Sequence, residues 1–175
     1  MNCFNGEKYL KQSLQSIIDQ TYKNWELIFW DNMSVDNSKE IFHSFNDSRF
    51  KYYQSSEHTL LYRARNLALN HVNGDYIAFL DTDDLWSKEK LETQLNLFRE
   101  DQSISLVYSN YYLKKKIKTK KKFTKPNNLH EGYILNKLLK FYSVGISTLI
   151  FKKEILAKYK FDERFHIIGD FDFII

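Results

Sequence analysis

Hydrophobic residues along the first hundred positions follow two different periods. In residues 6–20, leucine and isoleucine recur on one face of a helix. Residues 26–30 (ELIFW) form a short apolar run that ends in a polar turn, which is typical of a buried strand. The same reasoning predicts helices at 36–46, 62–74 and 87–99, and strands at 50–53 and 75–80. Gly74 is well placed to end the helix at 62–74.

Strands that alternate with helices imply a mostly parallel sheet with helices on both faces. We therefore predict an α/β fold in a single domain, residues 1–175, with a Rossmann-like, nucleotide-binding first half. In such sheets ligands bind beyond the carboxyl ends of the strands. Asp31 and Asp81 each follow a predicted strand directly, so both are expected at that edge.

Residues 101–175 are less regular than the first half. Strands are predicted at 104–112 and 144–151, and helices at 131–141 and 152–159. The chain enters its first helix with no predicted strand before it, and it stops inside an apolar pattern with no terminating signal. From these features we expect the fold to be incomplete at both termini.

Composition and charge narrow the class of protein. A chain of 175 residues with 43% hydrophobic residues can bury one core. The formal net charge is +4, but the segment from Lys114 to Lys125 holds eight lysines and no acid, which leaves −4 for the rest of the chain. This concentration argues against a nucleic-acid-binding surface spread over the fold. The lysine-rich segment is either a solvated loop or a flap attracted to anionic lipid or to an acidic acceptor.

The remaining composition points to the cytoplasm. Cys3 is the single cysteine, so no internal disulfide can form, which fits a reducing compartment. No apolar run approaches the roughly 18 residues of a membrane helix, and no signal peptide is visible. We expect a cytoplasmic chain, with any membrane contact peripheral and at the inner face.

Three carboxylates follow the predicted strand at 75–80. Asp81, Asp83 and Asp84 repel one another unless a positive charge lies among them. Residues two apart on an extended segment point to the same side, so Asp81 and Asp83 can converge on one ligand. Mg²⁺ or Mn²⁺ would relieve the repulsion, because these ions prefer carboxylate oxygens and share their shell with phosphates. The alternative is that Asp83 or Asp84 caps the helix that begins near Ser87.

Other candidate residues are individually weaker. Asp31 and Asn32 are suited to hold a ribose or base, or to form a turn with side-chain hydrogen bonds. Arg63 and Arg65 are suited to a diphosphate, although arginines on a helix are often only solvated. Asp170 lies between large apolar residues, where its pKa would rise toward that of a useful base; the alternative is an N-cap of a final helix. No G-x-G-x-x-G, Walker or G-x-S-x-G motif is present, which argues against Rossmann dehydrogenases, P-loop enzymes and serine hydrolases.

Taken in order, these pieces resemble the family 2 glycosyltransferases, which have the GT-A fold, over essentially the whole chain. The family's first turn reads NCFN here (2–5), and its Asp-Asp-Gly-Ser turn reads DNMS (31–34). The stretch RARNLALNHVNGDYIAFLDTDDLW (63–86) matches the family's Ala-Arg-Asn helix followed by its Asp-x-Asp motif. GDFDF (169–173) falls where the family has Glu-Asp-x-Asp. Four motifs in the same order and spacing make the resemblance specific.

The resemblance implies a nucleotide-sugar donor, with UDP as the nucleotide, and a saccharide or lipid-linked saccharide acceptor, in the synthesis of cell-surface polysaccharide. Residues 1–100 would bind the nucleotide-sugar, and residues 101–175 would form the acceptor side. Mg²⁺ or Mn²⁺ would lie under the diphosphate, and attack from the opposite face would invert the anomeric carbon. By the same resemblance, Phe4, Asp31, Arg65 and Asp81 would contact the donor, Asp83 would bind the metal ion, and Asp170 would be the base that deprotonates the acceptor hydroxyl.

Two positions depart from the family pattern. Asn32 replaces the family's second Asp, and Gly169 replaces the Glu before the base. The family's first strand would lie before Met1, and the family continues past the base, so the resemblance also implies truncation at both ends. An alternative function is therefore a catalytically inactive remnant that binds at most a nucleotide or a partner protein. A metal-dependent phosphotransferase is a third alternative, but the chain lacks a phosphate-cradling loop.

Overall fold

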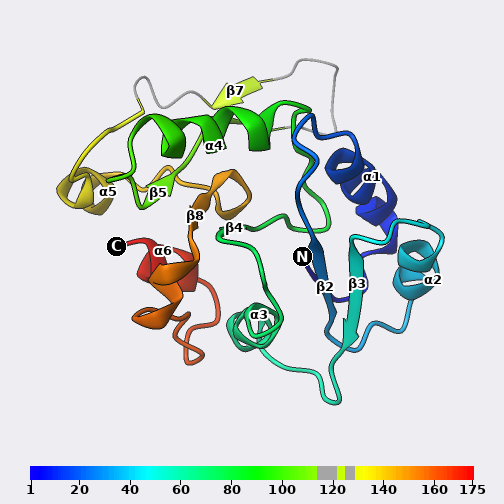
Figure 1. The fold of residues 1–175 in the computed structure, drawn as a ribbon. Coiled ribbons are helices and arrows are strands. Elements are labelled where there is room, and N and C mark those ends of the chain that lie inside the picture. Colours follow the sequence, from blue (N-terminus) through cyan, green and yellow to red (C-terminus); the bar gives the residue numbers. More distant parts are fainter. Residues whose placement is uncertain (114–121, 125–128) are drawn as a thin grey trace.

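The chain alternates strands and helices over its first hundred residues, as the sequence predicts (Figure 1). The computed structural model describes residues 1–113, the backbone of 122–124, and residues 129–175. In chain order the elements are β1 (Asn2–Cys3), α1 (Glu7–Ile18), β2 (Leu27–Asp31), α2 (Ser38–His43), β3 (Phe50–Gln54), α3 (Leu61–Leu69), β4 (Tyr76–Ala78), α4 (Lys90–Glu100), β5 (Leu106–Val107), β6 (Tyr111–Leu113), β7 (Lys122–Thr124), α5 (Leu135–Lys140), the 3₁₀ helix η1 (Ile146–Thr148), β8 (Ile150–Lys152), the 3₁₀ helix η2 (Lys153–Ala157) and α6 (Gly169–Ile174).

The strands β1, β2 and β3 form a parallel sheet in that order. Asn2 lies opposite Trp30 and Cys3 opposite Asp31, and the Trp30 N–H donates to the Met1 carbonyl at 2.9 Å. The expectation that no strand precedes the first helix is therefore wrong. Two residues are too few to show an alternating pattern, so only their pairing with β2 reveals the strand.

Every residue of β2 is buried, because helices cover both faces of the sheet. Leu27 and Phe29 share a cluster with side chains of α1 and α2. Ile28 and Trp30 point to the other face and pack against the alanines of α3. Figure 1 shows the same layers, with α1 and α2 on one side of β2 and β3 and α3 on the other. The predicted α/β architecture with helices on both faces is confirmed.

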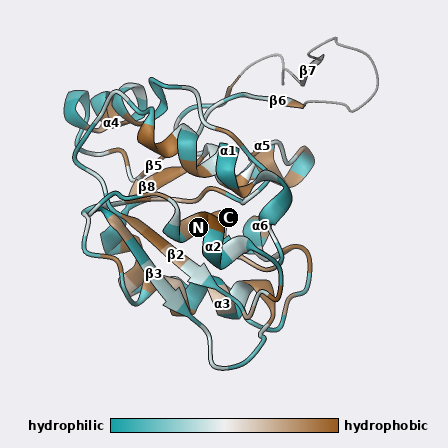
Figure 2. Cartoon of the chain, turned by 90° about the vertical axis from the view of Figure 1, so that its right-hand side faces the viewer, coloured by the Kyte–Doolittle hydropathy of each residue, from teal (hydrophilic) through white to brown (hydrophobic). Residues whose placement is uncertain are grey.

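A second, antiparallel sheet has the order β4-β8-β5. Ile77 of β4 and Leu106 of β5 both lie opposite Phe151 of β8, which is fully buried. Figure 2 shows β5 and β8 as hydrophobic strands beside α4. Because β4 belongs to the first half of the chain and β8 to the second, this sheet joins the two halves through one core.

Three predicted elements in the second half differ from the structure. The strand predicted at 104–112 is divided into β5 and β6, and the helix at 152–159 is only the 3₁₀ helix η2. The strand predicted at 144–151 begins late, because η1 precedes β8. Both the N–H and the hydroxyl of Thr148 bond the Gly145 carbonyl, at 2.9 and 2.7 Å, which closes a turn where the apolar pattern suggested extended chain.

The helix α3 is shorter than predicted, and Gly74 does not end it. α3 stops at Leu69. A carboxylate oxygen of Glu26 accepts the backbone N–H groups of Asn73 at 2.6 Å and of Gly74 at 3.3 Å. These bonds tie the segment to the start of β2 and replace the carbonyl acceptors that a longer helix would supply.

Candidate functional site

The segments that follow β1, β2 and β4 meet at one edge of the fold. Cys3, the last residue of β1, lies opposite Asp31, the last residue of β2. The turn after β1 lies against the acidic loop, since a Cβ atom at Gly6 would be 3.1 Å from the Oγ1 of Thr82. Such an approach leaves little room for a side chain, so glycine suits this position. The structure thus brings the predicted residues of all three segments together.

Residues 81–84 form a turn, and the extended conformation predicted for them is wrong. The Asp84 N–H donates to the Asp81 carbonyl at 3.1 Å. The buried hydroxyl of Ser13, on α1, contacts the carbonyl oxygens of Thr82 at 3.0 Å and of Asp84. The sequence did not single out Ser13, because a serine on the buried face of a helix carries no motif. Its bonds fix the acidic turn against the first helix.

The carboxylates of the turn do not cap α4. That helix begins at Lys90 and its N-cap residue is Glu89, so the capping alternative for Asp83 and Asp84 is wrong. Partial desolvation raises the pKa of Asp84, and the negative charges of Asp81 and Asp83 raise it further. Asp83 is exposed to solvent. The mutual repulsion expected from the sequence is therefore present in the folded chain.

Arg65 lies between two of the predicted carboxylates. Its Nη2 donates to Oδ1 of Asp81 at 3.1 Å, and its Nη1 donates to Oδ1 of Asp170. The Arg65 side chain is 2% exposed, against 38% for Asp81 and 26% for Asp170. Arg63, on the same helix, is exposed and pairs with Glu57. The structure thus separates two arginines that reasoning from the residues left equivalent, and it places Arg65, the one singled out by the resemblance, inside the site.

Asp170 lies in the first turn of α6, but the N-cap of that helix is Ile168, so the capping alternative is wrong. Burial raises the pKa of Asp170 above its usual value. The positive charge of Arg65 opposes this rise, and the negative charge of Asp81 supports it. A partly exposed carboxylate with a raised pKa is suited to accept a proton.

The two departures from the family pattern have structural causes. A Cβ atom at Gly169 would lie 2.6 Å from the ring of Tyr62, so a larger residue there would displace the tyrosine. Asn32 is buried; its Nδ2 donates to the Thr59 carbonyl at 2.8 Å, and its Oδ1 accepts the Thr59 N–H at 3.2 Å. An aspartate cannot donate to a carbonyl. Asn32 therefore anchors the loop after β3.

Asp31 is fully buried, and its carboxylate has partners within the fold. The Tyr52 hydroxyl donates to Oδ2 at 2.5 Å, and the Ser34 N–H donates to Oδ1 at 2.7 Å. Because Asp31 is fully buried, direct contact with a nucleoside would require a neighbouring group to move, so the donor contact of Asp31 stays a prediction. Tyr52 was missed because it reads as an ordinary residue of a strand.

An exposed aromatic pair lies beside Asp31. The rings of Phe4 and His58 have centroids 4.2 Å apart, and both residues are exposed. The Nδ1 of His58 lies 3.1 Å from the carbonyl oxygen of Asn32. His58 has no motif spacing, so only the folded structure reveals it. Aromatic surfaces of this kind are suited to stack on a nucleobase.

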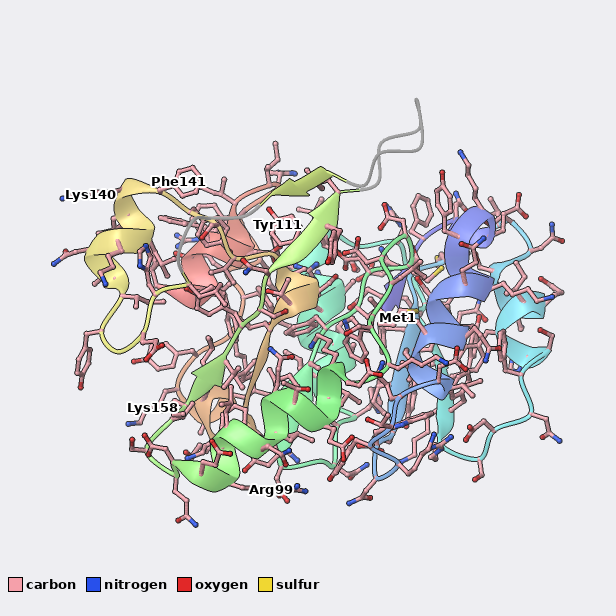
Figure 3. The ribbon with its side chains drawn as sticks, turned by 90° about the horizontal axis from the view of Figure 1, so that it is seen from above. Met1, Arg99, Tyr111, Lys140, Phe141 and Lys158 are labelled. Atoms are coloured by element: carbon pink, nitrogen blue, oxygen red, sulfur yellow. The ribbon has the colours of Figure 1, made fainter. Side chains whose placement is uncertain are left out.

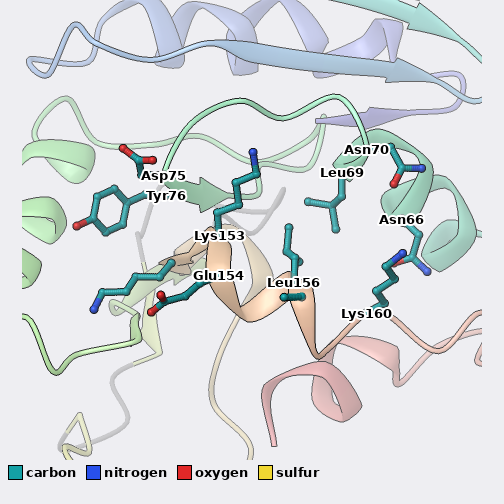
Figure 4. Close-up of a pocket in the computed structure, with 11 residues that line it drawn as sticks. Asn66, Leu69, Asn70, Asp75, Tyr76, Lys153, Glu154, Leu156 and Lys160 are labelled. Carbon is teal, nitrogen blue, oxygen red and sulfur yellow. The ribbon is translucent and has the colours of Figure 1, made fainter.

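A cavity of about 640 Å³ lies at the other end of β4 (Figure 4). Its lining includes Asn66 of α3, Asn70 just after that helix, Asp75 next to β4, and Lys160. None of the six predicted site residues lines this cavity. We therefore assign it no part in the candidate site.

The acidic turn is the predicted metal site. Within the described part of the chain, no three His, Cys, Asp or Glu side chains are grouped to hold a metal ion. Magnesium, however, is commonly bound through one or two carboxylates together with substrate phosphates. Asp83 offers an exposed carboxylate; burial is the largest cause of the raised pKa of Asp84, and the neighbouring charges of Asp81 and Asp83 raise it further. The exposed carboxylate of Asp83 is chemically suited to one position in the shell of such an ion, and the metal role of Asp83 stays a prediction.

Comparison with known sequences gives consistent matches. The family model described as Glycosyl transferase family 2 matches residues 1–167. The Escherichia coli UDP-Glc:alpha-D-GlcNAc-diphosphoundecaprenol beta-1,3-glucosyltransferase WfgD is 35% identical over 161 residues, which are 92% of this chain and 62% of the relative. The E. coli enzyme of the same description named WfaP is 33% identical over 147 residues, 84% of this chain and 57% of the relative. The chain thus spans about three-fifths of the length of these relatives.

Solved structures show the same fold. A crystal structure of S. aureus TarS superposes with a TM-score of 0.81 at 22% identity, covering 98% of this chain and 52% of that one. The mannosyltransferase PcManGT from Pyrobaculum calidifontis gives a TM-score of 0.69 at 17% identity, covering 93% of this chain and 46% of that one. These similarities confirm the predicted GT-A fold.

Proposed function

The chain belongs to glycosyl transferase family 2, and we propose that it transfers a sugar from a UDP-sugar to a lipid-linked saccharide in polysaccharide synthesis, with inversion. The observation that carries this proposal is the acidic turn after β4, which Arg65 joins to Asp170. The names of WfgD and WfaP, which specify UDP-Glc and a GlcNAc-diphosphoundecaprenol, support the classes of donor and acceptor.

The donor would lie along the carboxyl edge of the strands. Phe4 and His58 offer aromatic rings to the uracil, and Asp81 helps to orient the diphosphate. Asp83 would hold Mg²⁺ or Mn²⁺, which supplies positive charge to the leaving diphosphate when bound. PcManGT, whose structure contains GDP-Man and Mn²⁺, supports this choice of ions.

Asp170 would act as the base. The acceptor hydroxyl oxygen attacks the anomeric carbon while its proton passes to the Asp170 carboxylate. The bond from that carbon to the diphosphate oxygen breaks, and its electron pair leaves with UDP. The raised pKa of Asp170 supports this role, because a more basic carboxylate takes the proton more readily.

The test is donor selectivity with a defined acceptor. The chain is incubated with labelled UDP-Glc, UDP-GlcNAc or GDP-Man and a synthetic lipid-linked GlcNAc diphosphate, and UDP and GDP affinities are measured by calorimetry. We expect labelled disaccharide from a UDP-sugar, and UDP binding at least about tenfold tighter than GDP binding, a difference near 1.4 kcal/mol. Equal affinities with no product would overturn the proposal. UDP selectivity with no product would favour the inactive, nucleotide-binding alternative.

A peripheral position at the cytoplasmic face of a membrane is part of this proposal. The lysine-rich segment from Lys114 to Lys125 lies almost entirely outside the described residues. Nearby in the chain, Leu139 of α5 and Phe141, which follows that helix, are exposed beside Lys140, and Figure 3 shows Lys140 and Phe141 at the outer end of the molecule. Apolar side chains flanked by lysines suit the surface of an anionic bilayer. Among the described residues, no helix has the length and apolar character to span a bilayer.

Binding to vesicles tests this contact. We expect the chain to sediment with phosphatidylglycerol vesicles and not with phosphatidylcholine vesicles, and added salt should weaken the binding. The double variant Lys115→Gln, Lys116→Gln should bind about tenfold or more weakly, since each lysine near the surface contributes about 1 kcal/mol. The matched double variant Lys158→Gln, Lys160→Gln should change binding less than about threefold. Equal losses in the two variants would show only a general charge effect.

A further inference from the structure

Arg65 is held rigidly on α3. Its guanidinium carbon lies 5.5 to 5.7 Å from the ring centroids of Tyr62, Phe79 and Phe161. The hydroxyl of Tyr62, on the same helix, donates to the carbonyl of Ile167 at 2.5 Å. The helix α3 therefore holds the segment that leads into α6 by a hydrogen bond, and it also places the guanidinium beside Asp170.

The guanidinium joins the two sides of the site. One nitrogen bonds Asp81, which follows β4, and another bonds Asp170, which lies about ninety residues later in the chain on α6. A planar guanidinium offers several fixed donors and can bind two carboxylates at once, whereas a lysine ammonium is a single point charge. The positions of Asp81 and Asp170 thus depend on the same side chain.

We propose that Arg65 is the positioning residue that couples the donor side of the site to the base, by bonding Asp81 and Asp170 through different nitrogens of one guanidinium. This inference rests on the proposed function. The arrangement also has an electrostatic advantage. When Asp170 takes the acceptor proton it loses its charge, but the buried guanidinium keeps Asp81 as a partner. A buried charge left without a partner would be costly.

The first experiment compares Arg65→Gln and Arg65→Lys with the matched control Arg63→Gln. Arg65→Gln should lower kcat roughly 100-fold, the scale expected when a catalytic group is misplaced by about an ångström. It should also weaken UDP binding several-fold, because Asp81 loses its partner. Arg65→Lys keeps the charge, but its single ammonium should retain a contact with only one of the two carboxylates. Compared with Arg65→Gln, either kcat or UDP affinity should therefore recover in part, and not both. Arg63→Gln should change neither.

Double variants separate coupling from general damage. Arg65→Gln should reduce kcat less than about threefold further when Asp170 is already Asn, because effects on one unit do not add. Likewise, its effect on UDP affinity should vanish when Asp81 is already Asn. Full additivity in folded variants would overturn the inference. Circular dichroism of each variant confirms folding, and Arg65→Lys serves if Arg65→Gln does not fold.

A measurement without turnover keeps this test separate from the proposed function. The Asp170 carboxyl is titrated by carbon-13 NMR, and the charged or titratable groups that face it are Arg65, Tyr62, Asp81 and Tyr142. Loss of the guanidinium charge should raise the pKa of Asp170 in Arg65→Gln and leave it unchanged in Arg63→Gln. If the chain transfers no sugar but this rise is seen, the coupling stands and the function fails. An unchanged pKa in folded Arg65→Gln would overturn the coupling.

Discussion

Replacement of Asp170 by asparagine should lower the rate of sugar transfer roughly 100-fold or more, in line with contributions of general bases, and leave UDP affinity near its wild-type value. Asparagine keeps the shape of the side chain and one acceptor oxygen but cannot take up the acceptor proton. The proposed donor contacts come from other residues, because Arg65 bonds Asp81 and Asp170 through different nitrogens and none of the proposed donor residues lies on α6. The effect should therefore fall on turnover and not on donor binding.

The matched control is Asp172→Asn, which removes an exposed carboxylate from the same helix. Its transfer rate should stay within about threefold of wild type, as is usual for surface substitutions. If Asp170→Asn transfers sugar at the wild-type rate, the base is another residue. If the variant loses its cooperative unfolding transition, Asp170 has a structural role instead, despite not being the N-cap of α6.

The sequence predicted the layers of the fold well because β2 carries a strong signal. Its five residues are all buried, and a continuous apolar run is what a strand covered on both faces requires. The amphipathic helix at the amino end is likewise confirmed as α1. Residue patterns fix which faces are buried. They do not fix partners, so the antiparallel pairing of β4 with β8 could not be derived from them.

The predicted site contained its carboxylates together with Phe4 and Arg65, but not Ser13, Tyr52 or His58, which the structure places beside them. Reasoning from the residues alone left Arg63 and Arg65 equivalent, and only the family resemblance assigned Arg65 to the donor. Residues two apart on a helix point to different faces, and the structure buries Arg65 while Arg63 stays exposed. Tyr52 and Ser13 act through bonds to residues far away in the chain. Such long-range contacts carry no local sequence signal. The turn at 81–84 was missed for a related reason, since its conformation depends on Ser13.

Asp83→Ala should remove most of the gain in UDP affinity that a divalent ion provides. In the wild-type chain we expect Mn²⁺ or Mg²⁺ to tighten UDP binding on the order of tenfold or more, near 1.4 kcal/mol, because the ion neutralises both the diphosphate and the carboxylates of the turn. Asp83 is exposed and forms part of the repulsion that raises the pKa of Asp84. Removal of its charge should relieve that repulsion while taking away an oxygen ligand.

Calorimetry with UDP in Mn²⁺ and in chelator measures this gain for the wild type, for Asp83→Ala and for the control Asp75→Ala. Asp75 is an exposed aspartate just before β4, at the opposite end of the same strand, so its loss changes the net charge equally without touching the turn. The control should keep the full gain.

In chelator, Asp83→Ala should bind UDP at least as well as the wild type, because one negative charge near the diphosphate is gone. Equal UDP affinity with and without the ion in the wild-type chain would contradict a metal site at this turn. An unchanged gain in Asp83→Ala would instead place the ion on other residues.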